Sequence, residues 1–162
     1  MKVIGIIGWK NSGKTYLAQK IIKKLTQKGL NISSIKRAHH NFDIDIPNSD
    51  SYLHRQSGST QVIISSSKKW AKITELNNKK EKTLIELLNE LENTDIVIVE
   101  GFKKEKHPKI EIIDDPEKKY LFKTTQNVIA VISNVSLNTK IPQFKKNDID
   151  LIIEFILKFK NE

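Results

Sequence analysis

The chain of 162 residues contains no cysteine, which excludes disulfide bonds and thiolate metal sites. It has only 6 glycines and 4 prolines, and they do not gather into a linker or a repeat. No apolar run approaches the length of a membrane helix, and the first, residues 3–8, is too short for a signal-peptide core. We therefore expect a cytoplasmic protein, with no membrane association, that forms a single domain over residues 1–162.

Acidic residues are in the minority, with 19 Asp plus Glu against 28 Lys plus Arg, of which only two are arginine. The resulting net charge of +9 suits a polyanionic ligand, although lysine-rich solvated faces would give the same excess. Nucleic-acid binding would need more exposed aromatic residues than the 7% present, or a recognisable module. We therefore expect no nucleic-acid partner.

Apolar periodicity predicts an alternation of strands and helices. Continuous or alternating apolar runs predict strands at 3–7, 30–35, 60–66, 70–74, 96–99, 109–113 and 128–132. Apolar residues at helical spacing predict helices after residue 14, over 84–91 and over 147–158. Capping residues at 49–51 and Gly58 predict a short helix between them, through about Gln56. This order predicts an α/β, three-layer fold with a mostly parallel (mixed) central sheet and an added β-hairpin at 60–74.

Residues 8–15 match the phosphate-loop pattern at every fixed position, and the motif lies between a predicted strand and a predicted helix. Glycines let successive backbone N–H groups turn toward phosphate oxygens, and the helix that follows adds its positive dipole end. We therefore expect a P-loop NTPase fold that binds a nucleoside triphosphate with Mg²⁺. The predicted nucleotide-binding positions in this segment are Gly8, Trp9, Lys10, Asn11, Ser12, Gly13, Lys14, Thr15 and Tyr16.

Three residues are predicted to act on the phosphates and the metal. Lys14 reaches the β- and γ-phosphates, and the Thr15 hydroxyl is a magnesium ligand in this class of loop. Glu100 ends the apolar strand 96–99, where a carboxylate helps to hold magnesium directly or through water. The alternative for Glu100 is an ordinary loop residue at the protein surface.

The segment after the second predicted strand concentrates ionisable groups. Asp43 and Asp45 are candidates to orient magnesium or the attacking water, while Lys36 or Arg37 can face phosphate. His39 is a further candidate for the nucleotide site, although a histidine metal site lacks a suitably spaced partner. A solvated loop with helix-capping acids is the alternative for each of these residues.

Two elements that would sharpen the function are absent. There is no Asn-Lys-x-Asp sequence for guanine, since residues 78–81 end in glutamate, and no glutamine or arginine is placed for rapid hydrolysis. Asn134, after the strand 128–132, can meet a guanine edge or be a simple loop asparagine. The motifs alone thus leave a slow GTPase and an ATP-dependent small-molecule or nucleoside kinase both open.

Three blocks together resemble the MobB family, the adapter proteins of molybdopterin-guanine dinucleotide biosynthesis. They are residues 4–15, residues 39–58 and residues 98–103, with residues 108–111 also in agreement. The middle block is the specific part, because a phosphate loop alone selects no family. The sequence departs from the family at Lys10, where a small residue is usual, at Tyr16, which replaces a common threonine, and at residue 41.

The resemblance implies a GTP-binding, weakly hydrolysing adapter that uses Mg²⁺ and works beside the molybdenum cofactor guanylyltransferase, which attaches GMP to molybdopterin. It also implies a homodimer, and molybdopterin itself is a possible ligand. On this interpretation one group of residues lines the nucleotide or partner face, namely His39, Asp43, Asp45, Asp50, Ser51 and Arg55.

Overall fold

The computed structural model describes residues 1–38, 42–77 and 80–160. The chain divides into two compact units. Unit 1 comprises Met1–Arg37 and Leu84–Glu162, and unit 2 comprises Ala38–Thr83. The single domain expected from the chain length stays a prediction.

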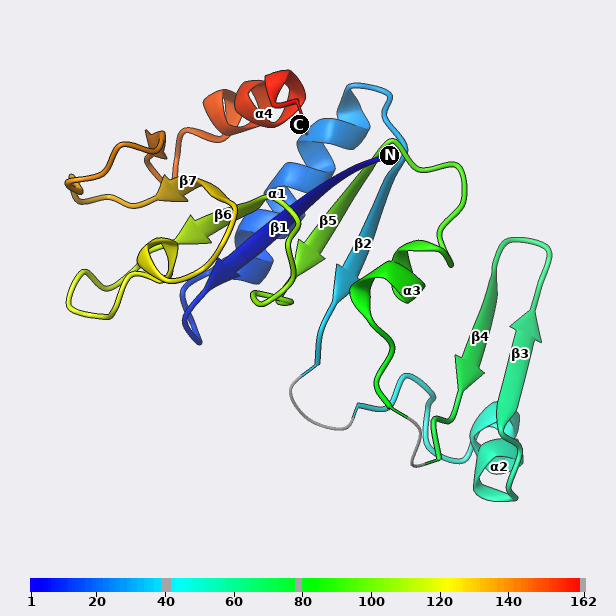
Figure 1. Cartoon of the computed structure of the whole chain (residues 1–162). Helices are drawn as coiled ribbons and strands as arrows, with labels where there is room; N and C mark the ends of the chain where they lie inside the picture. Colours follow the sequence, from blue (N-terminus) through cyan, green and yellow to red (C-terminus); the bar gives the residue numbers. More distant parts are fainter. Residues whose placement is uncertain (39–41, 78–79, 161–162) are drawn as a thin grey trace. The chain divides into compact units, whose positions relative to one another are not determined.

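Unit 1 is built on a six-stranded sheet with the order β2-β5-β1-β6-β7-β8 (Figure 1). Each pairing in this sheet is parallel, as expected for strands whose apolar runs are buried on both faces. The predicted α/β class is therefore confirmed. The strands are β1 (Lys2–Gly8), β2 (Ile32–Lys36), β5 (Ile96–Glu100), β6 (Lys109–Ile112), β7 (Val128–Ile132) and β8 (Gln143–Phe144).

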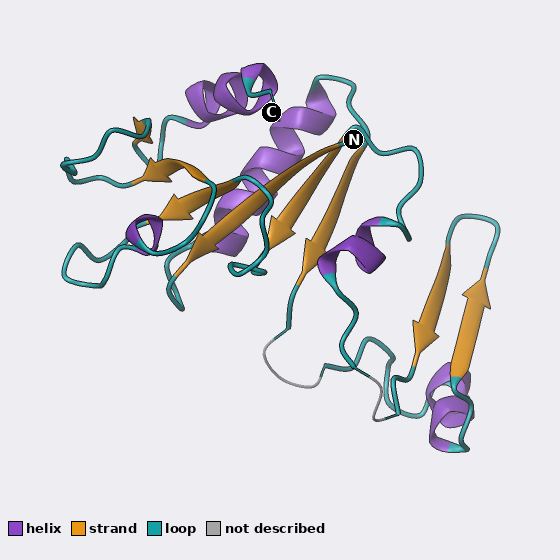
Figure 2. Ribbon diagram, in the orientation of Figure 1, coloured by secondary structure: helices purple, strands orange, loops and turns teal. Residues whose placement is uncertain are grey.

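Helices cover both faces of this sheet unequally (Figure 2). Helices α1 (Lys14–Gln27) and α4 (Ile149–Lys158) pack on one face, around a core that includes Ile6, Ile21 and Ile153. The other face has only the short α3 (Leu84–Leu88) and connecting segments, with Leu84, Val97, Val99 and Phe102 buried beneath them. The predicted helix over 84–91 ends early, because its last residues bond three positions back in turns.

Unit 2 contains α2 (Asp50–Gln56) and a hairpin of β3 (Gln61–Ser65) and β4 (Trp70–Thr74). The hairpin is antiparallel, as predicted, and its turn closes through the bond from the Ser66 N–H to the Lys69 carbonyl at 2.9 Å. Ser49 caps α2 by accepting a bond from the Tyr52 N–H at 3.4 Å. In neither unit does a described helix combine the length and apolarity needed to cross a membrane.

Candidate functional site

Residues 8–15, called loop 8–15 here, join the carboxyl end of β1 to the first turn of α1. Gly13 adopts a positive φ of 91° and Asn11 a φ of 64°, so the backbone passes twice through the left-handed region before the helix begins. A Cβ atom on Gly8 would lie 2.7 Å from both the Ile112 carbonyl oxygen and Ser12 Oγ. Only glycine therefore lets the loop pass this close to β6.

The first turn of α1 directs N–H groups without intrahelical partners toward the loop. No acidic side chain occupies this first turn, so the positive end of the helix dipole is not neutralised locally. Ser12 is 4% exposed, and its hydroxyl has no hydrogen-bond partner among the described residues. Loop 8–15 therefore presents several donors that an anionic ligand can accept from.

Lys14 crosses the loop and donates from Nζ to the Trp9 carbonyl oxygen at 2.7 Å. Burial lowers the pKa of Lys14, the carboxylate of Glu100 opposes this shift, and Lys36 adds to it. The ammonium group is thus held inside the loop by a neutral acceptor. A phosphate oxygen is a stronger acceptor for this cation and can replace the carbonyl.

Thr15 and Glu100 lie side by side, as the sequence predicts for two magnesium ligands. The Thr15 hydroxyl donates to the Glu100 carboxylate at 3.0 Å and 3.1 Å. Adjacent ligands of an octahedral Mg²⁺, with metal–oxygen distances of about 2.1 Å, lie about 3 Å apart. The two side chains are therefore spaced as neighbouring ligands of one such ion would be.

The pairing of β1 with β5 explains why these residues meet. Ile6 is in register with Glu100, so the carboxylate stands beside the point where β1 enters loop 8–15. Lys36, at the end of β2, lies 3.5 Å from the Glu100 carboxylate through its Nζ atom. Within the described residues no cluster of three or more His, Asp or Glu side chains is arranged for a metal.

Trp9 is tied to a segment far along the chain. Its indole Nε1 donates to the Lys119 carbonyl oxygen at 2.8 Å, and the Nζ atom of Lys103 lies 5.5 Å from the ring centroid. These contacts hold the outer side of loop 8–15 against two loops of unit 1. The motif places Trp9 in the loop but does not reveal either contact.

Three further residues considered for the nucleotide site are exposed or have structural contacts. Lys10 is exposed, and Tyr16 is 63% exposed with the Lys20 ammonium 4.4 Å from its ring centroid. Asn134 accepts a bond from the Lys146 N–H at 3.3 Å through its side-chain oxygen, as a structural loop asparagine does.

The predicted residues of unit 2 form a separate cluster around Arg55. Its guanidinium bonds Asp43 at 2.5 Å, Asp45 at 2.9 Å and Glu75 at 2.6 Å. Glu75, followed by Asp45, contributes most to raising the pKa of Arg55. Asp45 is only 4% exposed at its side chain. Within this unit the three acids thus cross-link α2 to its neighbours, and the magnesium roles of Asp43 and Asp45 stay predictions.

Other predicted residues of this block have local roles or lie outside the described residues. Asp50 begins α2, and the Ser51 hydroxyl lies 3.2 Å from that of Ser49. His39 falls outside the described residues. Glu75 was missed by sequence reasoning, because only the folded hairpin brings it to Arg55.

The chain has a phosphate loop between the first strand of its parallel sheet and the helix that follows, and a carboxylate ends the adjacent strand. These features define the class of P-loop NTPase-like α/β proteins. Residues 3–134 match the family described as "Molybdopterin guanine dinucleotide synthesis protein B". The chain belongs to this family.

Relatives from two bacteria carry the name molybdopterin-guanine dinucleotide biosynthesis adapter protein. The protein from Escherichia coli K12 is 33% identical over 97% of this chain and 92% of its own length. The protein from Haemophilus influenzae is 36% identical over 95% of this chain and 86% of its own. These relatives give the kinase alternative no support.

Solved structures agree with this grouping. A crystal structure of molybdopterin-guanine biosynthesis protein B matches with a TM-score of 0.78 and 28% identity, over 96% of both chains. A structure of Bacillus subtilis MobB matches with a TM-score of 0.72 and 26% identity, over 100% of both chains.

Proposed function

We propose that this chain is an adapter protein of molybdopterin-guanine dinucleotide biosynthesis that binds GTP with Mg²⁺ in loop 8–15. The observation that carries the proposal is the Thr15–Glu100 pair beside Lys14, at the amino end of α1. Backbone N–H groups and Lys14 would hold the phosphates, and the pair would hold the metal. The family and the names of the relatives supply the pathway.

The adapter would work in the cytoplasm beside a guanylyltransferase that attaches GMP to molybdopterin. Hydrolysis of GTP would be slow, because the sequence places no obvious glutamine for positioning the attacking water. The nucleotide would then persist long enough for a partner to engage it.

A second copy of the chain is the proposed homodimer partner. The hairpin of unit 2 has apolar side chains on both faces, with Val62, Ile64 and Ile73 on one and Ile63 and Trp70 on the other. Ile63 is 66% exposed and Trp70 69% exposed. A two-stranded hairpin is marginally stable alone, so covering these side chains with a second copy would stabilise it.

Trp9 gives a direct test of nucleotide binding. A Trp70→Phe background leaves Trp9 as the sole tryptophan, and its fluorescence is recorded during titration with GTP or ATP, with and without Mg²⁺. We expect Mg²⁺-dependent binding that prefers GTP and is lost in Lys14→Ala. Lys23→Ala, which removes an exposed lysine from α1, is the matched control and should bind normally. A preference for ATP, or no response to either nucleotide, would contradict the proposal.

The partner is tested separately. Purified guanylyltransferase should co-elute with this protein in size-exclusion chromatography when GTP and Mg²⁺ are present. If no complex forms under conditions where GTP binds, the adapter role is contradicted. The proposed nucleotide site would not be contradicted by that result.

A further inference from the structure

An open groove of about 350 Å³ lies in unit 1 between the loop after β5 and the segment after the 3-10 helix η1 (Leu121–Lys123). Its volume falls in the range of small-molecule sites. Two lysine side chains and two threonine side chains line it, and Leu121 adds an apolar surface. The full lining is Lys103, Lys104, Leu121, Thr124, Thr125 and Gln126.

The groove walls are joined by hydrogen bonds from two side chains, of which Lys109 is buried and charged. Lys109 is 0% exposed and donates from Nζ to the carbonyl oxygens of His107 at 2.7 Å and Gln126 at 3.1 Å. The Asn127 side chain donates to the Lys106 carbonyl oxygen at 2.5 Å, again joining the two walls. Unit 1 therefore holds this groove open with specific bonds between segments separated by about twenty residues in sequence.

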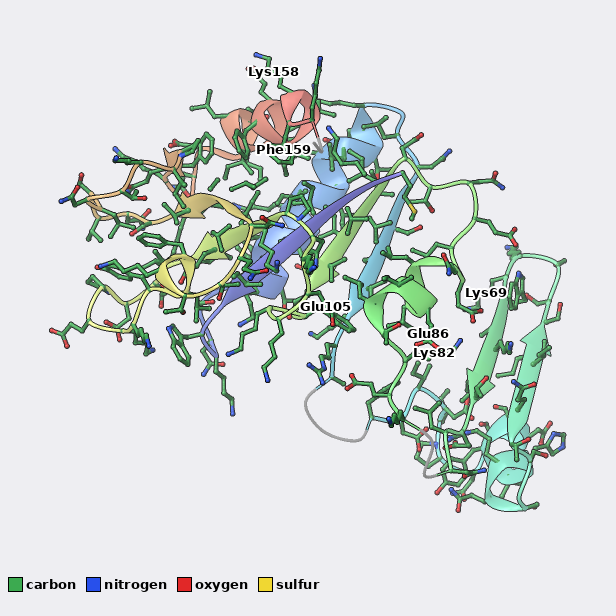
Figure 3. All side chains as sticks on the ribbon, viewed as in Figure 1. Lys69, Lys82, Glu86, Glu105, Lys158 and Phe159 are labelled. Atoms are coloured by element: carbon green, nitrogen blue, oxygen red, sulfur yellow. The ribbon has the colours of Figure 1, made fainter. Side chains whose placement is uncertain are left out.

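The charge of the groove favours an anion. No acidic side chain lines it, and no ion pair joins Lys103 or Lys104 to a carboxylate within the described residues. Glu105, labelled in Figure 3, follows these lysines in the loop between β5 and β6 but does not line the groove. Lysine ammonium groups and threonine hydroxyls are both donors to phosphate oxygens.

Lys103 connects the groove to loop 8–15. It lines the groove and also lies 5.5 Å from the centroid of the Trp9 ring. Lys103 is thus shared between the groove and the outer side of loop 8–15. Joining two phosphorylated compounds into a dinucleotide requires their phosphates to be brought near one another.

We propose that this groove binds the phosphate group of a phosphorylated pterin, the compound to which the guanine nucleotide is joined. The proposal rests on the proposed function of loop 8–15, and it adds a second ligand site with its own residues. Lys103, Lys104 and Thr125 would contact the phosphate, and Leu121 with the lysine methylene chains would contact the apolar part of the ligand.

The test uses protein already saturated with GTP and Mg²⁺, so that loop 8–15 is filled. A stable pterin phosphomonoester, the same pterin without phosphate, and inorganic phosphate are each titrated by isothermal calorimetry. We expect saturable binding of the phosphomonoester at one site. The unphosphorylated pterin should bind at least tenfold more weakly, and inorganic phosphate should compete.

Two double variants remove the same charge from different places. Lys103→Ala/Lys104→Ala should weaken phosphomonoester binding at least tenfold. Lys68→Ala/Lys69→Ala, in the exposed hairpin turn of unit 2, should bind like wild type, and equal thermal midpoints would show that both variants fold. Equal binding by the two variants, equal binding of the unphosphorylated pterin, or no saturable binding would overturn the proposal. Failure of GTP to bind in the saturation step would instead contradict the proposed function.

Discussion

Glu100 receives the Thr15 hydroxyl from α1 and lies 3.5 Å from the Lys36 ammonium on β2. If this carboxylate holds magnesium, Glu100→Gln should weaken GTP binding roughly 10- to 100-fold in the presence of Mg²⁺. In EDTA the variant should bind as well as wild type or better, because a negative charge beside the phosphates has been removed. Trp9 fluorescence measures GTP binding in both cases. An equal loss of GTP affinity with and without Mg²⁺ would contradict a metal-binding role for Glu100.

We expect His107 to make the free energy of unfolding depend on pH. Both of its ring nitrogens lack hydrogen-bond partners among the described residues, and the ring packs against the backbone of Gly5 on β1. Burial, followed by the nearby Lys109 ammonium, lowers the pKa of His107 from 6.5 to about 4. Between pH 6.5 and about pH 4, His107 is protonated in the unfolded chain and neutral in the folded chain. The free energy of unfolding should therefore fall as pH falls from 6.5 to 4, by up to about 3 kcal/mol.

Urea denaturation at pH 7.5 and pH 5 checks this dependence. His107→Gln should reduce the difference between the two pH values, whereas His54→Gln, at an exposed position on α2, should leave it unchanged. An undiminished pH dependence in His107→Gln would assign the effect to other groups.

At the scale of elements, η1 is held to the sheet by one buried acid. Glu111 is 1% exposed and accepts bonds from the N–H groups of Leu121 at 2.7 Å and Phe122 at 2.6 Å. Burial raises the pKa of Glu111, and these two N–H groups act in the opposite direction. Glu111→Gln would leave one buried N–H facing another donor.

We expect Glu111→Gln to lower the free energy of unfolding by about 1–3 kcal/mol, the usual effect of an unsatisfied buried polar group. Urea denaturation at pH 7.5 measures the change. Glu117→Gln, at an exposed position in the same segment, should be neutral. Equal stability of the two variants would show that the contacts of Glu111 contribute little.

Apolar periodicity was sufficient to predict most elements. The strand 128–132 coincides with β7, because it has a strong apolar pattern. The short helix predicted from its capping residues coincides with α2, because Ser49 does cap it. The two-residue β8 and the three-residue η1 were not predicted. Both are too short to carry a period, and tertiary bonds, such as those from Glu111, define them.

At the scale of the whole molecule, motif spacing predicted contacts only where strand topology implied them. The meeting of Thr15 with Glu100 follows from the rule that parallel strands share a carboxyl edge. The cluster of Arg55 with Asp43, Asp45 and Glu75 follows no such rule. This cluster depends on the fold of unit 2 and leaves no local signal in the sequence. The division of the chain into two units also depends on that fold and leaves no local signal.

The exposed apolar hairpin gives a prediction about assembly. If a second copy covers Ile63 and Trp70, the double variant Ile63→Lys/Trp70→Lys should shift the protein from dimer to monomer, because two buried ammonium groups would be left unpaired. Size-exclusion chromatography with light scattering measures the mass, and Lys68→Ala/Lys69→Ala in the adjoining turn is the control that should stay dimeric. Trp9 lies in unit 1, so its fluorescence response to GTP shows independently whether unit 1 of the variant is folded. A wild-type protein that is monomeric at micromolar concentration, or a double variant that remains dimeric with its GTP response intact, would show that this hairpin is not the interface.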